Sequence, residues 1–363
     1  MPDSRIHITY LIGQLGMGGY EKQMTLLVES IDRSKFKTSI IVWGSEKGYY
    51  LKRLTSIGIE VTSIRRLNFT NKLFFIRNSL KRNKSKFIHN YSFFLNFITW
   101  LSSLFTPAKP IGAVRSNVKY ESESMPMILK LLNIWFPRVI IFNSYSAKSY
   151  LERAIFLPSK QESIVIQNGI DVSLYPKVEY KKNKIIRLLS IGSLKKIKRQ
   201  NWLIKIGERL EQSNIDFQID ILGEGPLFDQ LEKQISNSDL DKKINLHGNI
   251  DSPIKYFLQS DIFLHTSSVE GFPNAVLEAM VIGLPIIACD AGDISLMIDN
   301  DKEGFVTPIN DFNIFYQKLI HLIDNPKIRR EVGLAAMSKA RKKYTHNQLI
   351  NNVCNLYHNQ KRF

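Results

Sequence analysis

The chain has 363 residues, of which 44% are hydrophobic and 23% are charged. This length suits two domains of about 150 to 200 residues, and this composition excludes a disordered chain. Two isolated cysteines, Cys289 and Cys354, exclude a disulfide framework and favour a reducing compartment. Residues 1–183 hold 27 Lys and Arg against 12 Asp and Glu, whereas residues 184–363 hold 23 against 21. The net charge of +17 therefore belongs almost entirely to the first half, which favours an anionic surface or a polyanionic ligand as partner.

The first half is predicted to be a doubly wound α/β domain. It opens with an apolar run at Ile6–Ile12, then a glycine-rich turn, then a helical pattern of apolar residues from Tyr20. Further strands are predicted at Thr38–Trp43, Val61–Ile64, Phe87–Asn90, Pro110–Val114, Val139–Asn143 and Ser163–Gln167.

The second half repeats the alternation of strand and helix. Strands are predicted at Arg187–Ile191, Asp216–Leu222, Ile244–His247, Ile262–His265, Pro285–Ala288 and Gly304–Val306. Helical segments of 10 to 15 residues between them indicate βαβ units and a parallel sheet. The polar stretch 176–184 is interpreted as a linker. We therefore expect one domain at 1–175, rejoined by a C-terminal helix at 347–363, and a second at 184–343, with a cleft between their strand ends.

Neither a targeting signal nor a membrane-spanning segment is predicted. Residues 1–12 lack a basic segment followed by an apolar one, and polar side chains interrupt the apolar stretch Phe87–Phe105. A cytoplasmic enzyme, bound to a membrane at most peripherally, is the expectation.

The stretch Glu270 to Glu278 has the features of an anion site. Pro273 suits the first position of a helix, which is expected to end before Gly283. The first backbone N–H groups of that helix, those of Asn274, Ala275 and Val276, would face an anion at the positive end of the helix dipole. Spacing alone allows two readings: a diphosphate site flanked by two carboxylates, or a surface loop followed by a solvated helix glutamate.

The same stretch resembles the Glu-x7-Glu signature of the retaining, GT-B-fold glycosyltransferases of family four, which build bacterial polysaccharides and lipid-linked glycans. In the second half, Gly192-Ser193-Leu194 with Lys198 is similar to the phosphate-binding turn of that family. Gly223-Glu224-Gly225-Pro226 is similar to its Gly-x-Gly-Pro turn.

The first half carries matching motifs in the family's order. Gly18-Gly19-Tyr20-Glu21 resembles the Gly-Gly-x-Glu turn, and Asn168-Gly169-Ile170-Asp171 resembles the Asn-Gly-x-Asp hinge. The resemblance therefore covers nearly the whole chain. It implies a GT-B fold, with two doubly wound Rossmann-like domains facing a central cleft.

The resemblance also implies site residues. Glu270, with the backbone that follows it, would hold the donor sugar, Glu278 the ribose, and Lys198 the diphosphate leaving group. The implied donor-binding residues are Gly18, Gly19, Ser193, Lys198, Glu224, Pro226, Gly271, Phe272, Pro273, Asn274, Ala275, Val276 and Glu278, and the implied catalytic residues are Glu270 and Lys198. A cation and oriented N–H groups would stabilise the leaving group without a metal, so neither metal nor cofactor is expected.

An Asp-x-Asp pattern at Asp299-Asn300-Asp301 is typical of metal-dependent glycosyltransferases of another fold. It lies in a polar stretch before Gly304, where turn chemistry accounts for both residue types.

The chain departs from the family's pattern at two places, one in the phosphate-binding turn and one near the acceptor. Many relatives carry an arginine where this chain has Ser193, and Lys195, Lys196 or Arg199 are candidates to replace that charge. Relatives often place a histidine near the acceptor, whereas the matching strand end here carries Arg115 and Ser116. His89 is a further acceptor-side candidate at a strand end, although a lone histidine there is more often structural.

Two stretches of the first half indicate contact with a membrane. Residues 64–87 combine eight Lys and Arg with a helical apolar pattern, and residues 125–136 are apolar on more than one face. Ordinary sheet-covering helices with solvated basic faces are the alternative for both.

The function predicted from the sequence is a retaining, metal-independent hexosyl- or N-acetylhexosaminyltransferase. It would move a sugar from a UDP- or GDP-sugar to a lipid-linked saccharide at the inner face of the cell membrane, in O-antigen or capsule-type polysaccharide synthesis. A soluble sugar or protein acceptor, or a non-catalytic relative that binds a nucleotide sugar, are the alternatives. Nucleic-acid binding is not expected, because no recognition motif accompanies the basic charge.

Overall fold

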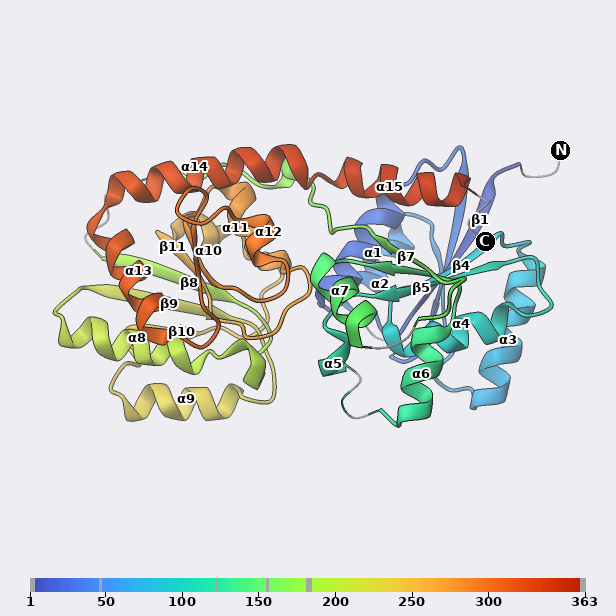
Figure 1. Ribbon diagram of the computed structural model, residues 1–363, viewed down its shortest axis with the longest axis horizontal. Helices are drawn as coiled ribbons and strands as arrows, with labels where there is room; N and C mark the ends of the chain where they lie inside the picture. Colours follow the sequence, from blue (N-terminus) through green and yellow to red (C-terminus); the bar gives the residue numbers. More distant parts are fainter. Residues whose placement is uncertain are drawn as a thin grey trace. The chain divides into compact units, whose positions relative to one another are not determined.

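The computed structural model of the protein describes residues 4–45, 48–121, 123, 125–154, 157–180 and 185–359. They form two compact units, each with its own parallel sheet (Figure 1). Unit 1 comprises Met1–Gly169 and His346–Phe363, and unit 2 comprises Ile170–Thr345.

Unit 1 is built on a seven-stranded sheet of order β3-β2-β1-β4-β5-β6-β7, with every neighbouring pair parallel. Its strands are β1 Ile6–Ile12, β2 Phe36–Val42, β3 Glu60–Ser63, β4 Phe87–Asn90, β5 Lys109–Val114, β6 Val139–Phe142 and β7 Glu162–Val165. The central strands are buried on both faces, which is why each reads as a continuous apolar run. All seven strands were predicted, with ends that differ by at most two residues.

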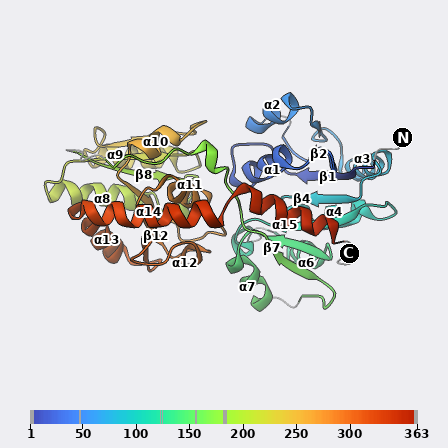
Figure 2. The same ribbon diagram turned by 90° about the horizontal axis from the view of Figure 1, so that it is seen from above.

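Helices cover both faces of this sheet (Figures 1 and 2). They are α1 Gly19–Ser30, α2 Tyr49–Ser56, α3 Phe69–Arg82, η1 Phe93–Leu95, α4 Asn96–Ser103, α5 Val118–Glu121, α6 Met127–Trp135, α7 Tyr145–Ala154 and α15 His346–His358. The basic amphipathic stretch forms α3, which begins where the Asn68 side chain accepts the N–H of Asn71. The uncharged apolar stretch forms α6.

The final helix of the described chain, α15, completes the core of unit 1. Leu349 and Val353 are buried together with residues of α1, and α15 lies beside α1 (Figure 2). The Tyr357 hydroxyl lies 3.1 Å from the Tyr10 hydroxyl and 2.7 Å from Nδ1 of His89. These buried contacts tie the end of the described chain to β1 and β4.

Unit 2 is built on a six-stranded parallel sheet of order β10-β9-β8-β11-β12-β13. Its strands are β8 Ile186–Ile191, β9 Phe217–Leu222, β10 Ile244–Leu246, β11 Ile262–His265, β12 Ile286–Cys289 and β13 Phe305–Thr307. Its helices are η2 Val172–Leu174, η3 Lys196–Lys198, α8 Asn201–Gln212, α9 Phe228–Asn237, α10 Ile254–Gln259, α11 Asn274–Ile282, α12 Ile294–Met297, α13 Phe312–Asp324 and α14 Pro326–Lys343. All six strands were predicted, again with shifts of one residue at some ends.

The boundary between the units differs from the one expected. Residues 170–175 were assigned to the first domain, but they belong to unit 2. Ile170 pairs with Thr345, and Ile170 and Tyr175 are buried in the core of unit 2. In the expected linker, Val178 donates its N–H to the carbonyl of Ile282, so this part is packed against unit 2. Residues 181–184 lie outside the described residues.

Within the described ranges, no helix is both long enough and apolar enough to cross a membrane.

Candidate functional site

The candidate site of unit 2 lies at the carboxyl edge of its sheet. The loops that leave β8, β9 and β11 there carry residues 192–200, 223–227 and 266–273. β8 lies between β9 and β11, so the direction in which the chain winds reverses at this point. Open α/β sheets bind their ligands outside the carboxyl ends of strands at such a switch point.

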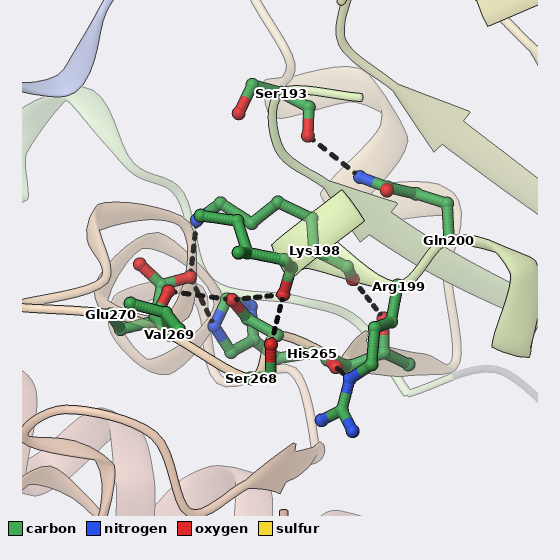
Figure 3. A network of polar contacts seen from close by, with 11 residues as sticks. Ser193, Lys198, Arg199, Gln200, His265, Ser268, Val269 and Glu270 are labelled. Atoms are coloured by element: carbon green, nitrogen blue, oxygen red, sulfur yellow. Dashed lines mark hydrogen bonds and ion pairs between the residues drawn. The ribbon is translucent and has the colours of Figure 1, made fainter. Parts of the chain in front are cut away.

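Lys198 and Glu270 form an ion pair at this edge. The Lys198 ammonium donates to Oε1 of Glu270, and Nε2 of His265 lies 3.0 Å from the same oxygen (Figure 3). His265 Nε2 is close enough to this oxygen for an ion pair, but the two atoms do not have the geometry of a hydrogen bond. The structure thus brings together the two residues for which the resemblance implied catalytic roles, although they are 72 positions apart.

His265 is a member of this cluster that the sequence analysis missed. It is the last residue of β11 and 5% exposed, and its ring stacks with that of Phe263. The available signal was a titratable residue at the carboxyl end of a predicted strand, five positions before Glu270.

The electrostatics of the cluster keep Glu270 ionised. Burial by itself would raise the pKa of the Glu270 carboxyl, but the Lys198 ammonium and the His265 ring outweigh it. The resulting pKa lies well below the ordinary range of a glutamate. A fixed negative charge at this place can accept hydrogen bonds from hydroxyl groups such as those of a sugar.

Lys198 is positioned by its backbone. The Thr266 hydroxyl donates to the Lys198 carbonyl at 2.7 Å, and the Ser268 N–H donates to the Ile197 carbonyl at 2.7 Å. These bonds join the loop after β8 to the loop after β11 (Figure 3). Arg199 follows with a left-handed backbone, φ +51°, which ends η3.

The charge expected at the position of Ser193 is not supplied by Arg199. The Arg199 guanidinium donates to the carbonyls of Thr266 and Ile309, and it lies 4.3 Å from the Trp202 ring centroid. Its role is to hold the loops together. Ser193 is exposed, and its carbonyl accepts a hydrogen bond from the Gln200 side chain at 3.0 Å. Lys195 and Lys196 are exposed and remain candidates.

α11 begins at the edge where Glu270 lies. Pro273 is its N-cap rather than its first helical residue, and Gly283, with φ +96°, ends it. The first N–H groups of any α-helix have no partner inside the helix, so this end is suited to an anion. Glu278 is 6% exposed on this helix, which contradicts the reading of a solvated helix glutamate.

Residues 271–273 and Val276 are buried, whereas Asn274 and Ala275 are partly exposed. The Phe272 ring packs against Tyr344 with ring centroids 5.5 Å apart, and Val276 is fully buried in the core of unit 2. Gly271 accepts the N–H of Asp293 at 3.0 Å. The side chains of this loop thus anchor it, as a backbone-binding role for Gly271 to Asn274 requires.

Glu224 and Pro226 lie on a turn that is locked to the turn of Ser193. The Leu194 N–H donates to the Glu224 carbonyl at 2.8 Å. A Cβ atom at Gly225 would lie 2.5 Å from the Leu194 carbonyl oxygen, so only glycine allows this approach. Glu224 and Pro226 themselves are exposed.

Gly18 and Gly19 form the start of α1 in unit 1. A Cβ atom at Gly18 would lie 2.1 Å from Oε2 of Glu21, whose side chain also accepts a hydrogen bond from Gln14 at 3.2 Å. Burial raises the pKa of the Glu21 carboxyl to about 7. A side chain at Gly18 would therefore have to displace the buried carboxyl of its own motif.

The acceptor-side candidates lie at the carboxyl ends of β4 and β5 in unit 1. His89 is fully buried, and burial, with a contribution from Arg115, holds the pKa of its ring well below the usual range. Arg115 is 8% exposed and lies over the ring of Tyr91, 4.2 Å from its centroid. Ser116 is partly exposed. Tyr91 is a residue that the sequence analysis did not single out.

A pocket of about 660 Å³ opens in unit 1 beside the ends of β1, β2 and β4. Its wall is largely aromatic and aliphatic, with Tyr20, Trp43, Phe69, Phe94, Phe97 and Leu129. Phe69, Phe94 and Leu129 are each about half exposed, and Nζ of Lys72 lies 4.3 Å from the Trp43 ring centroid. The pocket is therefore apolar, and a cation contacts Trp43 of its wall.

Among the described residues, no three His, Cys, Asp or Glu side chains are grouped so that they could hold a metal ion. In the Asp-x-Asp pattern, Asp299 pairs with Lys339 at 3.3 Å and Asp301 pairs with Lys318 at 2.9 Å.

Comparison with known proteins finds a family that part of the chain resembles. Residues 173–339, which lie in unit 2, match the family described as glycosyl transferases group 1. The matched stretch contains Ser193, Lys198, His265, Glu270 and Glu278, which are the residues of the unit 2 site.

Two curated relatives illustrate the family. The chain is 28% identical over 221 residues to N-acetylgalactosamine-N,N'-diacetylbacillosaminyl-diphospho-undecaprenol 4-alpha-N-acetylgalactosaminyltransferase of Campylobacter jejuni, covering 58% of each chain. It is 23% identical over 266 residues to UDP-Gal:alpha-D-GlcNAc-diphosphoundecaprenol alpha-1,3-galactosyltransferase of Escherichia coli, covering 68% of each. Several other curated relatives are matched over about half of their length or less.

The fold is that of solved glycosyltransferase structures. Anabaena HepE in complex with UDP-glucose superimposes with a TM-score of 0.85 over 98% of this chain and 100% of the other, at 16% identity. The protein accordingly has the GT-B fold, with two parallel-sheet α/β Rossmann-like units.

Proposed function

We propose that the protein is a retaining glycosyltransferase that moves a hexose or N-acetylhexosamine from a nucleotide-diphosphate sugar to a lipid-linked saccharide. The observation that carries this proposal is the Lys198–Glu270 pair at the switch point of the unit 2 sheet, beside the first turn of α11. The match of residues 173–339 to the group 1 glycosyl transferases supports the same class of reaction.

The donor half of the proposal follows from the charges of the unit 2 site. Breaking a sugar–phosphate bond puts negative charge on the nucleotide diphosphate. Lys198 and the N–H groups at the start of α11 are the groups that would stabilise this charge, and the reaction would need neither metal nor cofactor. Glu270 would hold the sugar hydroxyls and Glu278 the ribose. Exposed Lys195 and Lys196 would compensate for Ser193.

The Lys198 and Glu270 charges neutralise each other, which limits the penalty of burying both. A bound diphosphate would give the Lys198 ammonium a second anionic partner, while Glu270 would keep the neighbouring His265 ring.

The acceptor half is supported by unit 1 and by the relatives. The printed names of the Campylobacter and Escherichia relatives specify diphospho-undecaprenol acceptors. In this chain, the pocket of unit 1 is apolar, and α6 exposes Met127, Ile128 and Leu129. An apolar chain with an anionic head group matches both the pocket and the +15 charge of the first half.

We further propose that the enzyme acts at the inner face of the cell membrane, in the synthesis of a bacterial surface polysaccharide. The basic residues of α3 and the exposed apolar residues of α3 and α6 would contact anionic lipids. Phe69 and Phe74 of α3 are 52% and 60% exposed. No nucleic-acid partner is proposed.

The direct test of the site is sugar transfer or donor hydrolysis by Glu270→Gln and Lys198→Met, compared with the unchanged protein. Loss of one transition-state charge partner costs about 100- to 1,000-fold in rate, and we expect a decrease of that order. Lys339→Met, in an ion pair far along the chain from the site residues, is the control. Unchanged activity in Glu270→Gln would refute the assigned site.

The donor's base and the acceptor class need separate measurements. A thermal-shift screen with UDP, GDP and their sugars identifies the base, because a ligand of the native state raises Tm by mass action. Flotation with anionic vesicles at low salt tests the membrane: absence of binding would favour a soluble sugar or protein acceptor. Nucleotide-sugar binding without turnover would favour a non-catalytic relative.

A further inference from the structure

Arg115 is a buried cation whose guanidinium forms no well-aligned hydrogen bond with the described part of the chain, and its polar neighbour there is the neutral Tyr91 hydroxyl. It directly follows β5 and is 8% exposed. None of its three guanidinium nitrogens has a hydrogen-bond partner among the described residues, and it forms no ion pair there. Its contact is the face of the Tyr91 ring, 4.2 Å from the guanidinium carbon.

This situation is costly for a group that keeps its charge at all ordinary pH values. A cation–π contact contributes about 0.5–2 kcal/mol, whereas the effective penalty for burying an ion is several kcal/mol. Other buried or half-buried arginines of the chain are satisfied differently: Arg341 donates to the carbonyls of Val281 and Tyr175. The folded chain alone gives Arg115 no comparable compensation.

Among the described residues, no carboxylate acts on Arg115 to replace hydrogen bonds. The ionisable groups that act on it are the hydroxyls of Tyr91 and Tyr357, and burial raises the pKa of both. His89 stays neutral, since burial and the charge of Arg115 lower its pKa. An anion arriving at this place would therefore meet a positive charge in a neutral, largely buried environment.

The backbone around Arg115 is held in place. Its carbonyl accepts a hydrogen bond from the Asn143 side chain at 2.8 Å, which links the end of β5 to the end of β6. Ser92, the residue after Tyr91, lines the apolar pocket of unit 1. The guanidinium thus belongs to the carboxyl edge of the unit 1 sheet, where α/β folds bind ligands. Tyr91, the residue that it contacts, is one position along the chain from the apolar pocket.

We propose that Arg115 is the anion-binding residue of unit 1 and that its ligand is a phosphate group of a substrate. The planar guanidinium offers a fork of donors that matches phosphate oxygens. This proposal rests on the proposed function, under which two substrates carry such a group. One is the lipid-linked acceptor, whose lipid would occupy the apolar pocket, and the other is the nucleotide-sugar donor.

The test is a thermal-shift and calorimetric titration of the full chain with inorganic pyrophosphate. It is made in a Lys198→Ala background, which weakens the anion site of unit 2. We expect Arg115→Met to leave Tm without ligand unchanged or higher, because it removes a buried unpaired charge. We expect the affinity for pyrophosphate to fall about 10- to 100-fold, the equivalent of lost charge-assisted hydrogen bonds. Arg115→Lys, which keeps the charge but not the fork, should lie between.

Arg77→Met is the matched control. Arg77 lies in unit 1 on α3 and donates to the Leu101 carbonyl at 3.1 Å, so its loss should lower Tm and leave pyrophosphate affinity unchanged. The proposal is overturned if Arg115→Met behaves in the same way, which would make Arg115 a structural cation held by Tyr91. It is equally overturned if glucuronate, a carboxylate, shows the Arg115 dependence and pyrophosphate does not.

Two further probes identify the source of the phosphate. Dependence of farnesyl diphosphate binding on Arg115 assigns it to the lipid-linked acceptor, and dependence of UDP binding assigns it to the donor. Because binding needs no turnover, an Arg115-dependent shift in a protein that transfers no sugar would support this proposal and overturn the proposed function. If Arg115→Met transfers sugar with unchanged KM values for both substrates, the proposed function is supported and the role of Arg115 is overturned.

Discussion

Lys198 and Glu270 have side chains that are only 20% and 10% exposed, and each neutralises the other's charge. The contact between them cannot be predicted from local sequence, because the two lie on loops after different strands. Their motifs were recognisable from residue type and spacing, and so were their expected roles. Their contact, and the participation of His265, depend on which strands are neighbours in the sheet. That order is a property of the tertiary fold.

Replacing Lys198 with methionine should destabilise the protein by about 3 kcal/mol, because the Glu270 carboxylate would stay buried without its main opposite charge. Urea denaturation measures this free energy of unfolding. The double variant Lys198→Met/Glu270→Gln should recover most of it, while sugar transfer stays low. A double variant as unstable as Lys198→Met would show that the pair does not act as a unit.

Glu21 gives the free energy of unfolding a defined pH dependence. Its pKa in the folded chain is about 7, above the value of about 4.3 in an unfolded chain. The folded chain thus holds the proton more tightly, and the resulting stability is fully present below pH 4 and is lost as pH rises through 7. Glu21→Gln should remove this loss and be more stable at pH 8 by roughly 3 kcal/mol. Urea titrations between pH 4.5 and 8.5 check it, and parallel pH profiles would contradict it.

At the scale of elements, most strands and helices could be predicted from the sequence because their buried residues form regular patterns. Central strands such as β1 and β4 are apolar on both faces, and α11 lies between a proline and a glycine. The strand ends were predicted less accurately, since the end of a strand depends on its neighbours in the sheet as well as on its own residues. Residues 170–175 were misplaced because their partners, Thr345 and the core of unit 2, lie far along the chain.

The turn of Glu224 depends on the absence of a side chain at Gly225. Gly225→Ala should push this turn away from Leu194, lower Tm by several degrees and weaken nucleotide binding, because its Cβ would lie 2.5 Å from backbone oxygen. Gly192→Ala is the matched control in the facing turn: its Cβ would meet only Lys198 Cδ, at 3.9 Å. Thermal unfolding with and without UDP compares the two. Equal losses of Tm would refute the steric argument.

At the scale of the whole molecule, the two units have different tasks. Unit 2 has its own sheet and core and contains every proposed donor residue except Gly18 and Gly19. Unit 1 carries nearly all of the net charge, as well as Arg115 and the apolar pocket. The charge difference between the halves was visible in the sequence, whereas the pocket and the unpaired guanidinium required the packing of several elements.

A polypeptide of residues 170–345 should therefore fold cooperatively and bind UDP. We expect a single thermal transition that UDP shifts upward, with lower affinity than in the full chain because Gly18 and Gly19 are missing. The same polypeptide with Lys198→Ala serves as the control and should show a smaller shift. Absence of a cooperative transition would show that unit 2 needs unit 1 to fold.

The contact between Tyr10 and Tyr357 has a consequence for biosynthesis. The two hydroxyls meet across 347 positions of the chain, and α15 closes a core that begins with β1. At about 5–20 residues per second, a ribosome makes Tyr357 roughly 17 to 70 s after Tyr10. All of unit 2 is synthesised during that interval, before α15 can complete the core of unit 1. Until then, nascent unit 1 leaves uncovered the apolar surface that α15 occupies in the folded protein.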